Sequence, residues 1–135
     1  MDTQKKYSYK LTLIVTILIS QIGFSQKTIL KENVPLDFNK FNTEKVIDMT
    51  NMFRDCEGLS LLELGDHFDT EKVIRMDEMF RGCEGLSSLE LGDHFDTSQV
   101  NNMYGMFQDC SGLSSLTLGD KFNTSQVILM DSMFR

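Results

Sequence analysis

The amino-acid sequence predicts an α/β repeat fold, a leucine-rich-repeat-like solenoid of 27-residue units that each contain a short strand and a helical segment. Three observations support this prediction. The same residue types recur at a spacing of 27, apolar residues within a unit recur first every three or four positions and then every two, and glycine-containing turns separate these patterns. A fixed period of roughly 20 to 50 residues indicates units that stack to share one core.

The repeat is clearest in its apolar residues, which form ladders of identical side chains. These ladders are Val46/Val73/Val100/Val127, Met49/Met76/Met103/Met130, Met52/Met79/Met106/Met133, Phe53/Phe80/Phe107/Phe134, Phe41/Phe68/Phe95/Phe122 and Cys56/Cys83/Cys110. Eight of the nine Met and eight of the ten Phe belong to them, so the unusual composition reflects stacking between units.

The first element of each unit is predicted to be helical. In the second unit Val73, Met76, Met79 and Cys83 are three or four residues apart, which is typical of one face of a helix. Thr70 precedes this segment as a candidate N-cap. Gly85 is positioned to end the helix in a left-handed conformation.

The second element is predicted to be a strand. Leu89 and Leu91 are two residues apart, the spacing at which a strand presents one face to a core. Gly92 begins a turn, and Phe95 then returns the chain to the interior. Strands of successive units should form a parallel ladder with a spacing of about 4.8 Å.

Over about residues 41–135 the sequence resembles the BspA-like leucine-rich repeat surface proteins. The resemblance rests on a motif that the second unit shows as Val73-x-x-Met76-x-x-Met79-Phe80-x-x-Cys83-x-x-Leu86-x-x-Leu89-x-Leu91. The resemblance implies a secreted or cell-surface protein of bacteria or some protists. It also implies adhesion to host or matrix molecules, without catalysis. The residues shared with that family are core residues, so the resemblance supplies no binding site.

Residues 1–25 are predicted to be a signal peptide. Lys5, Lys6 and Lys10 precede an apolar run, and Gly23 and Ser25 are small residues suited to cleavage after Ser25. The run is about a dozen residues long, whereas a spanning helix needs roughly 20, although an uncleaved anchor is the alternative. We therefore expect a secreted or cell-surface protein that contacts the membrane only through this segment during export.

The rest of the chain is divided at residue 40. Residues 26–40 match the repeat poorly and are expected to form an amino-terminal cap or linker, with Leu36 and Phe38 packing on the first unit. Residues 41–135 should form about three and a half repeats, truncated at the carboxy end within a fourth helical element.

The charge excludes one class of partner. The 13 basic and 20 acidic side chains give a net charge of −7, and removal of residues 1–25 leaves 10 basic and 19 acidic groups, a charge of −9. Nucleic-acid binding needs a basic surface, so it is not expected.

No cofactor, metal or enzyme activity is predicted. Thioethers suit Cu(I), but the Met ladder lies on the same face as Val and Cys and is interpreted as core packing. Cysteines 27 apart in register point in parallel directions, so we expect small buried thiols without disulfides. No arrangement of nucleophile and base stands out from the repeats.

Acidic and histidine ladders are interpreted as surface turns. Asp66/Asp93/Asp120 form one ladder, and Asp69/Asp96 with Asn42/Asn123 form another. A calcium ion bound by the stacked oxygens is the alternative, but Asp and Asn beside Thr are ordinary turn residues. His67 and His94 have Lys121 as their third equivalent, which disfavours a metal ladder.

Recognition should use positions that vary between units while the core stays constant. On the strand these are Leu61/Ser88/Ser115 and Glu63/Glu90/Thr117; on the other side they include Arg75/Asn102/Leu129 and Asp77/Tyr104/Asp131. We expect the six strand positions to bind a host or matrix protein or glycan, with basic or hydroxyl-rich ligands favoured. Two alternatives stay open: a solvated face without a ligand, and a structural spacer at the start of a longer surface protein whose active domain lies downstream.

Overall fold

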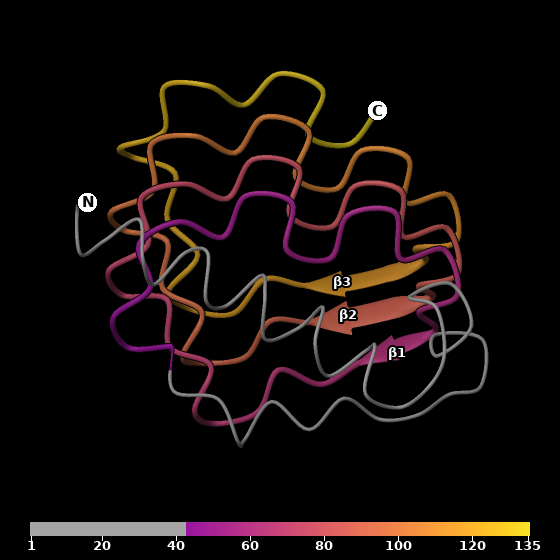
Figure 1. Cartoon of the computed structure of the whole chain (residues 1–135), viewed down its shortest axis with the longest axis horizontal. Coiled ribbons are helices and arrows are strands. Elements are labelled where there is room, and N and C mark those ends of the chain that lie inside the picture. The colour runs from indigo at the N-terminus through magenta and orange to yellow at the C-terminus, as the bar shows by residue number, and fades with distance from the viewer. Residues whose placement is uncertain (1–42) are drawn as a thin grey trace, which may run out of the picture.

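The computed structural model describes residues 43–135, which wind into stacked coils of 27 residues each (Figure 1). We number the coils 43–69, 70–96 and 97–123, followed by a partial fourth coil, 124–135. The predicted signal peptide and its cleavage after Ser25, and the amino-terminal cap or linker at 26–40, lie outside the described residues.

One side of the stack is a small parallel sheet, which we call the strand side. Its strands are β1 (Leu61–Leu62), β2 (Ser88–Glu90) and β3 (Ser115–Thr117), in the order β1-β2-β3. The register aligns residues 27 apart, for example Leu62 with Leu89 and Leu89 with Leu116. The predicted strand ladder is therefore confirmed.

The predicted α/β class is wrong, because residues 43–135 contain no helix. The segment expected to be helical is a series of β-turns, which in the three full coils are closed by hydrogen bonds between residues three apart. Met79 N–H donates to Met76 O at 3.3 Å, and Cys83 N–H donates to Phe80 O at 3.2 Å. We call this part of the coils, residues 49–56, 76–83, 103–110 and 130–135, the turn side.

The third residue of each of these turns has a positive φ, as in a type II turn. In the second coil these residues are Glu78, at 55°, and Gly82, at 73°. The other turns use Asn51, Asp55, Gly105, Asp109 and Ser132. A right-handed helix cannot pass through such residues, and two four-residue turns in sequence give the same apolar spacing as a helix.

The backbone of the turn side bonds mainly to the next coil. Glu78 N–H donates to Tyr104 O at 2.7 Å, Phe80 N–H to Met106 O at 2.9 Å, and Gly82 N–H to Gln108 O at 2.9 Å. Alternate amides thus bond along the stack, as in a parallel sheet, and this satisfies buried backbone groups without a helix.

Two predicted helix-end residues have other roles. The hydroxyl of Thr70, which is fully buried, donates to Asp96 O of the next coil at 2.8 Å, so Thr70 joins two coils and caps no helix. Gly85 is absent from the residues with positive φ. A Cβ at this position would lie 2.5 Å from Glu57 O, so glycine is needed because the two coils approach closely.

The core lies between the two sides and contains the described members of the predicted apolar ladders, except the exposed Met130 and Phe134. Phe41 lies outside the described residues. Phe80 stacks between Phe53 and Phe107, with ring centroids 5.3 and 5.5 Å away and nearly parallel planes. The methionines of the ladder are buried except Met130, so their predicted packing role is confirmed for the other seven. Each such large side chain contributes roughly 1.5–3 kcal/mol through burial.

The cysteines are free thiols, as predicted, and Cys56 and Cys83 are buried while Cys110 is half-buried. The thiol of Cys83 donates to Phe53 O at 3.2 Å, and that of Cys110 donates to Phe80 O at 3.1 Å. Burial is the main cause that raises the pKa of both thiols. Cys83 and Cys110 are therefore packing residues with little thiolate character.

Candidate recognition surfaces

The strand side presents the six residues that the sequence analysis selected. Leu62 and Leu89 are buried and Leu116 is half-buried, so the alternating neighbours point outward. The structure leaves all six side chains exposed: Leu61, Ser88, Ser115, Glu63, Glu90 and Thr117. We call these six residues the strand face.

Pairing of the strands places the strand face in two ladders. Leu61 aligns with Ser88 and Ser88 with Ser115, while Glu90 aligns with Thr117. Glu63 lies one residue beyond β1. Each ladder changes chemistry along the stack, from an apolar side chain to hydroxyls in one and from carboxylates to a hydroxyl in the other.

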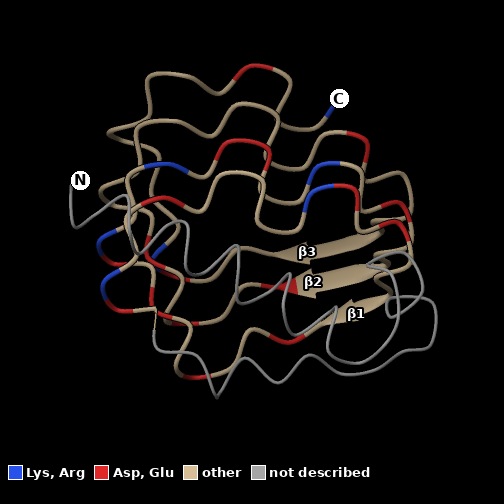
Figure 2. Ribbon diagram, viewed as in Figure 1, with Lys and Arg blue, Asp and Glu red and all other residues tan. Residues whose placement is uncertain are grey.

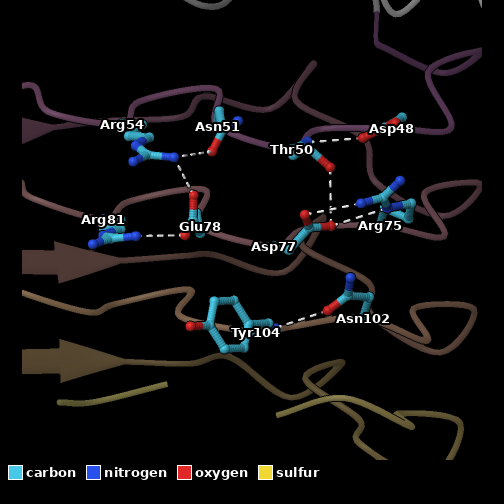
Figure 3. Close-up of polar contacts among 10 residues, drawn as sticks. All are labelled: Asp48, Thr50, Asn51, Arg54, Arg75, Asp77, Glu78, Arg81, Asn102 and Tyr104. Atoms are coloured by element: carbon cyan, nitrogen blue, oxygen red, sulfur yellow. Dashed lines mark hydrogen bonds and ion pairs between the residues drawn. The ribbon is translucent and has the colours of Figure 1, made fainter. Parts of the chain in front are cut away.

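The turn side carries a polar network that joins the first two coils (Figure 3). Glu78 accepts from Arg54 of the first coil, and it also accepts from Arg81 of its own coil at 2.6 Å. Arg54 donates further to Asn51 Oδ1 at 3.4 Å. The Glu78 side chain is only 14% exposed, so this network is partly shielded from water.

A second pair lies beside the first in Figure 3. Arg75 donates from Nε and Nη2 to the two oxygens of Asp77, both at 3.0 Å. Asp77 also accepts from Thr50 Oγ1 of the preceding coil at 3.0 Å. Hydrogen bonding to the Asp77 carboxylate is the main cause that raises the pKa of Arg75, and hydrogen bonding to Glu78 likewise raises the pKa of Arg81. These guanidiniums are engaged within the chain.

The third coil lacks the charged side chains that form these pairs in the second coil. Asn102 stands where the second coil has Arg75, Tyr104 where it has Asp77, and Gln108 where it has Arg81. Asn102 Oδ1 accepts from the Tyr104 amide at 3.0 Å, and the Tyr104 side chain is exposed. Figure 2 shows the resulting change along the turn side, from blue and red segments to mainly tan.

A shallow hollow of about 270 Å³ lies between the coils beside Gly82. Arg54 and Arg81 line it, but each guanidinium faces a carboxylate, Asp55 at 3.4 Å and Asp109 at 3.6 Å. Glu57 and Glu84 add further negative charge. The hollow is therefore poorly suited to an anion.

The described members of the second acidic ladder are turn residues, as predicted, and Asn42 lies outside the described residues. Asp69 Oδ1 accepts from the Glu71 amide, Asp96 Oδ1 from the Ser98 amide, and Asn123 Oδ1 from the Ser125 amide, each at 2.8 Å. These are Asx turns. Hydrogen bonds from Ser98 are the main cause that lowers the pKa of Asp96.

Other sequence-selected residues are also on the surface, because His67, His94 and Lys121 are exposed. Within residues 43–135 no group of three or more His, Cys, Asp or Glu side chains is arranged to hold a metal ion. The same part of the chain contains no helix that is long and apolar enough to cross a membrane.

The network around Glu78 was missed by the sequence analysis, which considered Arg75 and Asp77 but neither Arg54 nor Glu78. The available signal was the recurrence of Arg54, Arg81 and Arg135 at multiples of 27. This recurrence places arginines in one column, but it does not reveal which acid lies between them.

The fold and these surfaces define a class: a stacked-coil repeat protein with a constant core and faces that vary along the stack. Residues 21–135 match the family model described as "Mycoplasma protein of unknown function, DUF285", and the chain belongs to this family. Membership indicates a surface-associated repeat protein of unknown function. No match to the chain was found among curated proteins or among solved structures.

Proposed function

We propose that the chain is an exported, non-catalytic surface protein whose strand face binds a protein or glycan of a host or matrix. One observation carries this proposal. The core residue types are constant between coils, whereas the exposed residues of the strand face differ, from Leu61 to Ser88 and from Glu90 to Thr117. The earlier resemblance to BspA-like surface proteins agrees with this role.

The chemistry of the strand face favours a ligand with basic or hydroxyl groups. Glu63 and Glu90 supply carboxylates, the serines supply hydroxyls, and Leu61, 63% exposed, supplies an apolar contact. Hydrogen bonds between coils hold these groups on a regular backbone, so little ordering is needed on binding.

The proposal is tested by screening the purified chain against immobilised matrix proteins and glycans, and then measuring the affinity of any ligand found. The double variant Glu63→Lys/Glu90→Lys should weaken binding at least tenfold, which corresponds to about 1.4 kcal/mol. The control Glu71→Lys/Asp131→Lys makes the same change of charge at exposed residues outside the strand face.

Equal affinity for the wild-type chain and the strand-face variant would contradict the proposal. Equal weakening by both double variants would also contradict it, because net charge alone would then explain binding.

The second candidate is a structural spacer in a longer surface protein. The observation that favours it is the pairing of Arg54, Arg75 and Arg81 with carboxylates of the same chain, which leaves these cations engaged internally. The Arg54–Glu78 pair joins two coils, whereas the other two pairs lie within the second coil. A spacer should bind none of the screened ligands, and fusion of a marker domain downstream should not change the melting temperature of the coils.

A further inference from the structure

One stretch of the third coil carries no charged side chain. Residues 97–108 contain no Asp, Glu, Lys or Arg, whereas the equivalent residues 70–81 of the second coil contain six such side chains. Residues 43–135 as a whole have 17 acidic and 7 basic side chains, a net charge of −10. The third coil therefore interrupts the charged surface of the turn side with a neutral one.

Tyr104 is the largest exposed side chain of this stretch, and it is 40% exposed. Coils flank it on both sides, because Glu78 N–H donates to Tyr104 O at 2.7 Å and Gly105 N–H donates to Asp131 O at 3.0 Å. Figure 3 shows the ring extending from the backbone toward the side on which Glu78 and Arg81 lie. The ring thus presents part of a flat aromatic surface to solvent on the turn side.

Two amide side chains adjoin Tyr104. Asn102 Oδ1 accepts from the Tyr104 amide at 3.0 Å, while Asn102 Nδ2 makes no hydrogen bond within residues 43–135. A Cβ on Gly105 would lie 2.9 Å from Gln108 Oε1, so the Gln108 amide lies over this glycine, the next residue after Tyr104. Both amides therefore belong to the same small area of surface as the ring.

The oxygen of Gln108 is a buried acceptor that receives no hydrogen bond within the described part of the chain. In the second coil the equivalent Arg81 donates to Glu78 at 2.6 Å, but Gly105 stands in the place of Glu78 in the third coil and offers no side-chain partner. Buried acceptors are normally satisfied in folded proteins. A ligand hydroxyl would supply the missing donor once the amide turns outward.

We propose that Asn102, Tyr104, Gly105 and Gln108, which we call the neutral patch, bind a neutral sugar residue of a glycan. The apolar C–H face of the sugar ring packs on Tyr104, a side chain that loses little conformational entropy on binding. Asn102 Nδ2 donates to one hydroxyl oxygen of the sugar, and Gln108 Oε1 accepts from another hydroxyl group. Gly105 has no side chain, so the backbone beside the ring is uncovered when the Gln108 amide turns outward.

The charge of the surroundings favours a neutral sugar. A chain with a net charge of −10 repels sialylated and sulfated glycans. A basic ligand finds no carboxylate in the neutral patch, and the neighbouring Asp77 and Glu78 already pair with arginines. Hydroxyl groups match amides, because both groups donate and accept hydrogen bonds. The neutral patch lies on the turn side, so it is a second recognition surface that does not depend on the function proposed for the strand face.

An array of neutral, sialylated and sulfated oligosaccharides, probed with the full chain, tests the proposal. At least one neutral oligosaccharide should bind, and its sialylated or sulfated form should bind more weakly. Calorimetric titration with that oligosaccharide then measures Tyr104→Asp, which should weaken binding roughly tenfold or more because the aromatic contact is lost. Asp77 occupies the equivalent position of the second coil, so this change should spare the fold, which circular dichroism verifies.

Three control variants separate the neutral patch from other causes. Gln99→Glu adds the same charge as Tyr104→Asp at an exposed residue of the same uncharged stretch, and the affinity should stay unchanged. Tyr104→Phe keeps the ring, so it should bind within about twofold of wild type. Glu63→Lys/Glu90→Lys alters only the strand face and should not weaken binding of the neutral oligosaccharide.

Binding of no neutral oligosaccharide, or equal affinities for wild type and Tyr104→Asp, would overturn the proposal. Equal weakening by Gln99→Glu and Tyr104→Asp would also overturn it, because added charge alone would then explain the loss. Loss of binding only in Glu63→Lys/Glu90→Lys would assign the glycan to the strand face and refute a site at Tyr104. A matrix protein, in place of a glycan, whose binding is lost only in Tyr104→Asp would refute the sugar ligand.

Discussion

The turn side and the strand side of the coils are built from the same backbone pairing but tolerate different sequences. On the turn side, left-handed residues and ion pairs such as Arg81 with Glu78 set the path of the chain. On the strand side, extended residues pair in register, and this extended backbone does not require particular residue types at the outward positions. The comparison indicates that the turn side maintains the stack, whereas the outward residues of the strand side are free to vary.

The largest expected effect comes from removing a ring shared by three coils. Phe80→Ala deletes a fully buried side chain stacked on both faces, which should lower the free energy of unfolding by about 3–5 kcal/mol. Urea denaturation measures this loss. On the strand side Leu61→Ala should change stability by less than about 0.5 kcal/mol, and a similar loss at both residues would remove the distinction between the sides.

Two glycine substitutions should distinguish the cost of a steric clash between coils from the cost of a left-handed backbone conformation. Gly85→Ala forces a Cβ to within 2.5 Å of Glu57 O and should cost about 1–3 kcal/mol, because one coil must move away from the other. Gly92→Ala meets no atom within 4 Å but has a φ of +75°, so only the left-handed conformation, about 1 kcal/mol, should be penalised. Thermal unfolding of both variants checks the order, and a larger loss at Gly92 would contradict it.

The ion network gives a smaller effect that depends on salt. Glu78→Gln keeps the shape of the side chain but removes the charge between Arg54 and Arg81, and should lower stability by roughly 1 kcal/mol. High salt screens partly exposed charges, so the stability difference between Glu78→Gln and wild type should shrink in about 1 M NaCl. Denaturation at low and high salt measures it; a salt-independent difference would indicate a steric cause.

The smallest effect should be a pH dependence at Asp96. Its pKa is lowered in the folded chain by hydrogen bonds from Ser98, so its contribution is fully present above the unfolded pKa of about 4 and is lost as pH falls through the folded value. Asp96→Asn keeps an Asx turn, as Asn123 does, but cannot titrate. The stability difference between wild type and Asp96→Asn should therefore disappear in acid. A constant difference from neutral to acidic pH would contradict this assignment.

The strands and the core could be predicted because each depends on one repeated contact. Leu89 and Leu91 alternate with outward residues, and identical core residues 27 apart stack on one another. The helix prediction failed because Met76, Met79 and Cys83 have a spacing that fits both a helix and successive turns. Asn, Asp and Gly at the third position of most turns would have favoured turns, since these residues adopt positive φ most readily.

The candidate surfaces could likewise be predicted only in part from the sequence. Exposure of the strand face follows from alternation alone, so Ser88 and Glu90 could be located from the sequence. The network of Arg54 and Glu78 could not, because these residues are 24 apart and meet only when the positions of the turns are known. Glu78 also has a positive φ, which its residue type does not favour.

The buried threonines that recur every 27 residues restrict the lengths by which the chain can be extended or shortened. Thr43, Thr70 and Thr97 each donate to a carbonyl 26 residues later, at 2.7, 2.8 and 2.8 Å. In-frame duplication or loss of one whole repeat therefore regenerates every one of these bonds at the new junction, whereas an insertion of any other length shifts hydroxyls away from their acceptors. Genetic recombination between repeats can thus lengthen or shorten the molecule without redesigning its interior.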